Sequence, residues 1–289
     1  MAGWCRWWLL VLISTVTSAA FANTPVVMNK AFADLSEERD YNYQLFKRAL
    51  AVTEDDYAAT ALTRYPLPMT QTRLIHELIS GKKVQVGVLA SGYWKRQGLI
   101  AIPIPVRRGL LGWRLLLTRE QALSRLPDLA NNMPALSTLT TGFGADWVEL
   151  PLMQQAFAHV ETLEQTSDLY QQLLDGNFDV FSRSVIELWL ELENLGSSAE
   201  QLAIVPGVVL RYPFADFFYV ASDQSELAKR IELGLQRLYA SGEYDALFRS
   251  FYGSVIKRAE LDNRRIIELN EIPLAPINEI AAHWWYRPK

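Results

Sequence analysis

Hydrophobic positions recur along the chain in two periods, and the alternation of those periods predicts both helices and strands. Apolar side chains lie three or four positions apart in residues 41–53 and 225–241, which predicts two amphipathic helices. Thr70 is suited to cap a third helix that stops at Gly81. Short apolar runs predict strands at 26–28, 60–64, 83–90 and 217–221.

A second series of the same kind occupies the middle of the chain. Strands are predicted at 139–142, 159–163 and 178–181, and helices at 147–158, 167–175 and 185–193. Gly142-Phe143-Gly144 is predicted to be a turn, with Asp146 as a possible N-cap, and residues 118–135 a loop or an irregular helix. No Pro/Gly/Ser-rich linker separates the two series, so they predict two α/β lobes joined by strands.

The first 22 residues have the pattern of a secretory signal peptide. Arg6 precedes an apolar stretch from Trp7 to Val16, and Ala20-Phe21-Ala22 is a small-x-small cleavage site. The alternative, a membrane anchor, is disfavoured because a span needs about 20 apolar residues. We therefore expect export to the periplasm of a mature chain that lacks the single cysteine, Cys5.

Composition and charge disfavour several classes of function. The chain has 28 basic and 32 acidic residues, whereas nucleic-acid-binding proteins usually carry a basic excess. Three histidines and one cysteine cannot form a Cys/His zinc site. No Gly-x-Ser-x-Gly nucleophile elbow is present, and Gly142-Phe143-Gly144 lacks the third glycine of a dinucleotide fingerprint. We therefore expect a binding protein without metal or other cofactor, rather than an enzyme.

Three segments resemble one family in the order in which that family carries them. Residues 226–253 (ELAKRIELGLQRLYASGEYDALFRSFYG) look like the closing helices of periplasmic solute-binding proteins of the amino-acid-binding, family 3 type. Residues 170–183 (YQQLLDGNFDVFSR) are similar to a helix-to-strand turn of the family's second lobe. Residues 109–117 (GLLGWRLLL) resemble the strand that crosses between lobes, and residues 264–288 resemble a tail in an uncharacterised branch.

The resemblance implies a fold, a domain organisation and a function. The fold would be the two-lobed, type II periplasmic-binding-protein fold, with a ligand cleft between α/β lobes. The lobes would comprise residues 24–112 with 216–289, and residues 113–215, and the chain would cross between them twice. The protein would be a monomer that captures a small, carboxylate-bearing, amino-acid-like ligand for an ABC-type importer. The alternative is a ligand sensor that regulates a membrane signalling partner.

Two departures from the family leave the ligand's identity open. The usual start, a strand followed by "Y.PF" and an aromatic residue that covers the ligand, is absent. The acid that would hold a ligand ammonium after the strand at Asp179 is also missing, since Val180, Phe181, Ser182 and Arg183 follow. The amine of a ligand would then be held elsewhere, or the ligand is not a standard amino acid.

Six residues are candidates for the ligand site because they stand at helix starts or strand ends. Arginine offers a planar fork for a carboxylate, tryptophan a stacking wall, and Asp146 an acceptor for an amine. The turn at 142–147 could also offer backbone N–H groups to an anion. Solvated or structural roles remain the alternative for each. The candidates are Arg73, Trp94, Arg96, Asp146, Trp147 and Arg183.

Overall fold

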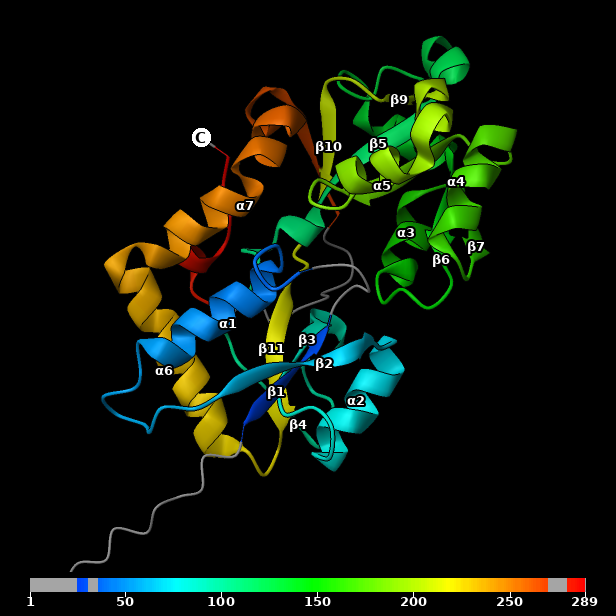
Figure 1. The fold of residues 1–289 in the computed structure, drawn as a ribbon. Coiled ribbons are helices and arrows are strands. Elements are labelled where there is room, and N and C mark those ends of the chain that lie inside the picture. The colour runs from blue at the N-terminus through cyan, green and yellow to red at the C-terminus, as the bar shows by residue number, and fades with distance from the viewer. Residues whose placement is uncertain (1–24, 31–35, 270–279, 289) are drawn as a thin grey trace, which may run out of the picture.

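The computed structural model describes residues 25–30, 36–269 and 280–288, and these form two α/β lobes (Figure 1). The first lobe lies below the second in this view, and α7 runs along one side of both. The signal peptide predicted at 1–22 falls outside the described residues. Among the described helices, none combines the length and the apolar character that a membrane span requires.

The first lobe contains two small sheets. One is the parallel pair of β1 and β2, and the other has the antiparallel order β3-β11-β4. A bridge between Met28 and Val86 joins the two sheets. The strands are β1 (Val26–Lys30), β2 (Leu62–Pro68), β3 (Gly87–Ala90), β4 (Leu99–Ala101) and β11 (Asp216–Ala221). The helices are α1 (Tyr41–Ala51), α2 (Gln71–Ser80), α6 (Ser225–Ser241) and α7 (Glu243–Ala259).

The second lobe is built on a seven-stranded mixed sheet with the order β12-β10-β5-β8-β6-β7, and β9 also pairs with β5. Its strands are β5 (Trp113–Arg119), β6 (Thr140–Gly144), β7 (His159–Leu163), β8 (Val180–Ser184), β9 (Leu202–Ile204), β10 (Val208–Arg211) and β12 (Arg265–Glu268). Its helices are α3 (Leu150–Ala156), α4 (Thr166–Asp175) and α5 (Leu188–Leu195). The predicted irregular stretch holds 3₁₀ turns at Glu120–Arg125 and Met133–Thr138.

Local sequence explains where several helices begin and end. Thr70 caps α2 as predicted, because its side chain accepts a hydrogen bond from the Arg73 N–H. Gly81 ends the same helix in the left-handed conformation, with φ of 64°, which glycine adopts without steric cost. The buried side of α6 carries Ile231, Leu235 and Leu238, the stripe from which this helix was predicted.

The predicted turn at Gly142–Gly144 is wrong, because these residues form the end of strand β6. The two glycines are needed there for packing. A Cβ at Gly142 would lie 2.2 Å from the ring of Phe178, and one at Gly144 would lie 2.3 Å from the ring of Trp147. The next helix, α3, begins only at Leu150, so Asp146 does not cap it.

The segments that cross between the lobes touch each other through their backbones. The chain passes into the second sheet just after Gly112 and leaves it between β10 and β11. The Tyr212 N–H donates to the Gly112 carbonyl at 3.1 Å, and a Cβ at Gly112 would lie 1.9 Å from the Tyr212 carbonyl oxygen. The crossing segments therefore lie side by side.

The chain also returns to the second sheet after α7. Strand β12 pairs in parallel with β10 over four residues. The expected assignment of residues 216–289 to the first lobe did not anticipate this pairing. The exact residue boundaries of the lobes stay a prediction.

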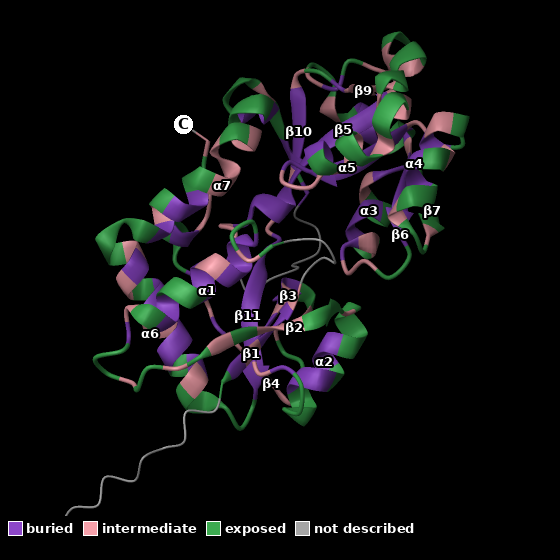
Figure 2. Ribbon diagram, in the orientation of Figure 1, coloured by how far each residue is buried: buried purple, intermediate pink, exposed green. Residues whose placement is uncertain are grey.

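Buried residues follow the sheets of both lobes. Strand β11 is buried throughout and so is most of β5, as the purple ribbons in Figure 2 show. One hydrophobic cluster continues from the first lobe past Leu110 and Trp113 to Phe181 and Trp189 of the second. The lobes thus share apolar packing around the crossing segments.

Candidate functional site

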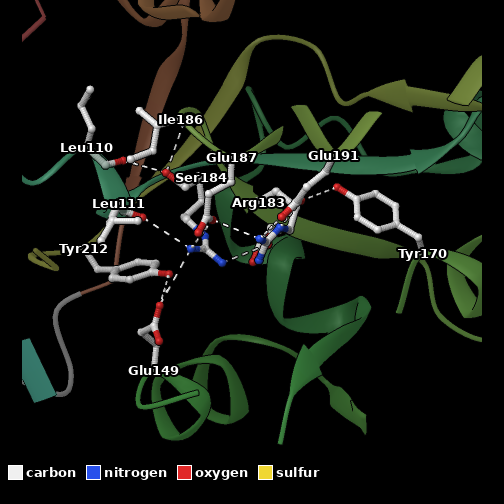
Figure 3. Close-up of polar contacts among 12 residues, drawn as sticks. Leu110, Leu111, Glu149, Tyr170, Arg183, Ser184, Ile186, Glu187, Glu191 and Tyr212 are labelled. Atoms are coloured by element: carbon white, nitrogen blue, oxygen red, sulfur yellow. Dashed lines mark hydrogen bonds and ion pairs between the residues drawn. The ribbon is translucent and has the colours of Figure 1, made fainter. Parts of the chain in front are cut away.

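A cluster of seven charged side chains lies where the second sheet meets the crossing segments, and Figure 3 shows part of it. We call it the interlobe charge cluster. Its members come from three strands, from the starts of two helices and from the crossing segment itself. They are Arg107, Arg114, Glu149, Arg183, Glu187, Glu191 and Asp216.

Arg183 on β8 is the most completely paired member. Its Nε donates to Glu191 Oε2 at 2.7 Å, and its Nη2 also contacts Glu191 Oε1, so Glu191 engages the guanidinium in two places. Glu187 Oε2 lies 3.2 Å from the same Nη2. Arg183 is only 4% exposed, and its guanidinium carbon stands 4.8 Å from the ring centroid of Trp147. Two charged partners and an aromatic face thus surround this arginine.

The ion pairs outweigh the cost of burial for this arginine and its partner. Burial by itself would lower the pKa of Arg183, but Glu187 and Glu191 raise that pKa above its ordinary value. Burial would raise the pKa of Glu187, yet Arg183, Arg114 and Arg107 together lower it. Both groups are therefore charged at neutral pH.

Arg114, on β5, forms the second half of the cluster. Its Nη1 lies 3.7 Å from Glu187 and 3.9 Å from Glu149, and its Nη2 donates to the Ser182 carbonyl at 3.2 Å. Glu149 behaves differently from Glu187: burial raises its pKa, and the attraction of Arg114 offsets this only in part. The cluster thus contains one carboxyl group whose pKa is raised and one, Glu187, whose pKa is lowered.

The first lobe contributes the pair of Arg107 and Asp216. Nε and Nη2 of Arg107 lie 2.8 and 2.7 Å from Asp216 Oδ2. Hydrogen bonds connect this pair to the second lobe: Leu110 N–H donates to the Arg107 carbonyl, and the Ser184 hydroxyl donates to the Leu110 carbonyl at 3.0 Å. Glu187 N–H in turn donates to the Ser184 carbonyl at 3.0 Å. The cluster therefore spans the crossing.

The structure brings two of the six predicted site residues into contact, Trp147 and Arg183. Asp146 is exposed next to Trp147, and its charge contributes, after burial, to the raised pKa of Tyr93 from the first lobe. The lobes also meet here, since a Cβ at Gly92 would lie 2.8 Å from Val148. Residues 146–148 of the second lobe thus face residues 92–93 of the first.

The other three predicted residues lie on the first lobe. Trp94 packs edge-on against Phe217, with ring centroids 4.7 Å apart. Arg96 lies in the loop between β3 and β4. The loop begins after Ala90, which pairs with Asp216 at the start of β11, and ends at Leu99, which pairs with Ala221 at the end of β11. Arg96 is exposed, and its N–H donates to the Tyr93 carbonyl at 2.9 Å.

Arg73 is also exposed, on α2, with its Nε 4.0 Å from Glu77. It does not join Trp147 and Arg183 in the described structure. A ligand role for each of the six residues stays a prediction.

The sequence analysis named Arg183 as a candidate for the ligand site but missed the acids that pair with it. The available signal was the spacing of Arg183, Glu187 and Glu191, in which each acid follows at a multiple of four residues. Arg114 gave no such signal, because its partner Glu149 is 35 positions away and comes from another element. Pairing of this kind depends on tertiary structure.

Hydrogen bonds extend the cluster to Tyr170. The Tyr170 hydroxyl donates to Glu191 at 2.7 Å, and burial first and the nearby Glu191 next raise its pKa, so it remains protonated. Across residues 25–30, 36–269 and 280–288, no group of three His, Cys, Asp or Glu side chains could hold a metal ion. The contacts that the cluster does show are ion pairs, hydrogen bonds and the stacking of Arg183 on Trp147.

The raised pKa of Glu149 leads to a testable dependence on pH. The folded protein binds this proton more tightly than the unfolded chain, whose carboxyl pKa is about 4.5, so the free energy of unfolding falls as pH rises through the folded pKa. In Glu149→Gln this loss disappears. Urea unfolding measures the free energy of unfolding of both proteins. The value for the variant minus the value for the wild type should increase with pH above about 4.5.

Glu77→Gln provides a control of opposite sign. The hydrogen bond from Lys83 lowers the pKa of Glu77, so its stabilising effect is present above the unfolded pKa and is lost as pH falls. The difference between this variant and the wild type should therefore decrease as pH rises. A difference for Glu149→Gln that is the same at every pH would contradict the assignment.

Neither a protein-family model nor a curated protein sequence matches this chain. Solved structures do match it. An ancestral arginine-binding protein bound to arginine is 17% identical, with a TM-score of 0.54, over 80% of this chain and 99% of its own. The substrate binding protein of an amino acid ABC transporter is 13% identical, with a TM-score of 0.54, over 80% and 100%.

A histidine kinase sensor domain with similarity to periplasmic binding proteins matches equally well. It is 16% identical, with a TM-score of 0.54, over 80% of this chain and 96% of its own. At these identities the likeness establishes the fold alone. The described structure and these neighbours together confirm the predicted fold: this chain has the two-lobed α/β fold of periplasmic solute-binding proteins.

Proposed function

We propose that this chain is an exported solute-binding protein, which captures a small ligand between its lobes in the periplasm and delivers it to an ABC-type importer. The observation that carries the proposal is the two-lobed fold whose lobes meet at Gly92 and Val148, beside the interlobe charge cluster. Capture then needs no covalent chemistry, only contacts that are better in the closed state than in the open one. The protein acts as a monomer.

The ligand is a small, amino-acid-like molecule that bears a carboxylate. Trp147 offers it an aromatic face, and Asp146 accepts an amine. Because Glu191 fills the fork of Arg183, a ligand carboxylate displaces Glu191 from that fork or binds another cation. The similar fold of the ancestral arginine-binding protein, which was solved with arginine bound, supports an amino-acid-like ligand.

A second candidate function is ligand sensing for a membrane signalling partner. The similarity to a histidine kinase sensor domain favours it. The two functions predict different partners for the liganded protein. Stimulation of ATP hydrolysis by a reconstituted importer supports transport, and a change in autophosphorylation of a reconstituted sensor kinase supports sensing.

A thermal-shift screen tests ligand binding directly. The panel comprises amino acids, short peptides, organic anions and amines, followed by calorimetry of each positive compound. A ligand present at 100 times its Kd stabilises the folded state by about 2.7 kcal/mol, which such a screen detects. If no compound of these classes shifts the unfolding temperature, the proposed ligand class is wrong.

A wedge at the contact between the lobes tests where the ligand is enclosed. In Gly92→Leu the new side chain meets Val148, whose nearest atom would already lie 2.8 Å from a Cβ. We expect at least about 10-fold weaker binding, equivalent to about 1.4 kcal/mol, and a larger scattering radius with ligand. Gly253→Leu, where a Cβ has open space, is the control. Equal ligand affinities of the two variants would show that the ligand is not enclosed by closure of the lobes at Gly92 and Val148.

A further inference from the structure

The end of α7 is tied to the second lobe by one arginine. Arg264 Nε donates to the Ala259 carbonyl, at the last residue of α7, at 2.7 Å. Its Nη1 donates to the carbonyls of Val205 and Val208 of the second lobe, at 2.9 and 3.1 Å. A single guanidinium therefore binds backbone oxygens of both α7 and the second lobe.

A second contact joins the same two elements. The guanidinium carbon of Arg258, on the last turn of α7, stands 4.0 Å from the ring centroid of Trp189 on α5. Trp189 is buried in the second lobe, whereas Arg258 is exposed, so the arginine reaches across from α7. The contact is a cation–π interaction between lobes.

Strand β12 then continues the chain along the second lobe. Besides the ladder with β10, the Leu269 N–H donates to the Arg211 carbonyl at 2.9 Å. Arg211 also pairs with Glu268 at 2.8 Å and stands over the ring of Trp113 at 5.5 Å. Residues 258–269 are thus attached to the second lobe right beside the crossing segments.

The described tail residues 280–288 pack on the crossing segment itself. Tyr286 N–H donates to the Arg108 carbonyl at 2.7 Å, and Arg108 Nη2 donates to the His283 carbonyl at 2.9 Å. The ring of Trp285 lies directly on Gly109, since a Cβ there would be 2.4 Å away. The tail therefore covers the residues that lead from the first lobe into β5.

The other side of the tail is anchored on α6 and α7. Trp284 is buried, with its ring centroid 4.6 Å from Tyr239 and 5.7 Å from Tyr244. Arg108 also forms an ion pair with Asp245 on α7. One end of the C-terminal region thus holds the first lobe, and the other end holds the second.

We propose that residues 258–269 and 280–288 form a C-terminal brace that restrains the two lobes from opening. A hinge of two crossing segments opens by changes in the dihedral angles of a few residues. Here the second lobe can swing away from α7 only if the contacts of Arg258 and Arg264 break. The brace therefore limits the range of opening, with or without a ligand, and its action does not depend on the proposed function.

Distance measurements between spin labels on the two lobes test the brace in the ligand-free full chain. Labels are attached at Ser80→Cys, at the end of α2, and at Ser197→Cys, after α5, both exposed, with Cys5→Ser to remove the native thiol. Arg264→Ala and Arg258→Ala should each lengthen and broaden the distance distribution. The double variant should show a larger shift than either single variant.

Arg265→Ala is the matched control. Arg265 is the neighbouring arginine, and its Nη1 donates to the Ala130 carbonyl at 3.0 Å, a contact with the second lobe that does not involve α7. The distance distribution of the labelled Arg265→Ala variant should coincide with that of the labelled chain in which all three arginines are kept. The proposal is overturned if the double variant, folded by circular dichroism, gives the same distribution as Arg265→Ala. Arg258 is exposed, so its replacement keeps the test available even if Arg264→Ala fails to fold.

Discussion

Replacing Arg183 with leucine is expected to lower the free energy of unfolding by about 3 kcal/mol, the lower end of the range for breaking a buried ion pair, because the two acids that lose their cation are half-buried. Arg183 is 4% exposed, and Glu191 and Glu187 both contact its guanidinium. In the double variant Arg183→Leu/Glu191→Leu much of this loss should be recovered, since the unpaired charge of Glu191 is removed too. Urea unfolding of the four proteins in the double-mutant cycle measures the coupling.

The control for this cycle is the pair of Lys229 and Glu226 on α6. Their side chains are 67% and 73% exposed, and such surface pairs contribute about 0–1 kcal/mol. If Arg183→Leu lowers the free energy of unfolding no more than Lys229→Leu does, the ion pairs of Arg183 do not stabilise the folded protein as expected. The cycle is run without ligand, so its result does not depend on any role of Arg183 in binding.

The second large effect is expected at the crossing, where Gly112→Ala should destabilise the protein by about 3 kcal/mol, the upper end for overpacking. The new Cβ would stand 1.9 Å from the Tyr212 carbonyl oxygen, and a backbone atom cannot rotate away as a side chain can. The two crossing segments must therefore separate, which also strains the adjacent hydrogen bond from the Tyr212 N–H. Thermal and urea unfolding measure the loss.

Gly253→Ala is the matched substitution for this prediction. Gly253 lies within α7, and a Cβ there would have no atom within 4 Å apart from its chain neighbours and the backbone of its own helix. Alanine should therefore stabilise the protein by about 0.5–1 kcal/mol through its higher helix propensity. Equal effects of the two substitutions would show that the crossing segments tolerate separation, contrary to their close packing.

The sequence by itself determined the elements whose signals are local. Helix α6 has the predicted bounds because its apolar stripe and the glycine that follows it lie within one continuous segment. The N-cap of α2 and the left-handed glycine at its end are local in the same way. The α/β class and the two-lobed fold followed from the order of such segments and from the resemblance that they carried.

Only the tertiary structure decided the features that depend on distant residues. Gly142 and Gly144 are strand residues because rings from Phe178 and Trp147 pack where side chains would stand. No sequence signal indicated the pairing of Arg114 with Glu149, which stands 35 positions further along the chain on another element. Local patterns carry no information about which distant groups meet.

The path of the C-terminal region was decided in the same way. Nothing local in residues 265–268 distinguishes pairing with the first sheet from pairing with the second. The choice depends on where α7 ends and on the carbonyls of Val205 and Val208 that Arg264 reaches there. Periodicity predicts a helix or a strand because neighbours in sequence must share a face, whereas pairing between strands is set by the packing of the whole chain.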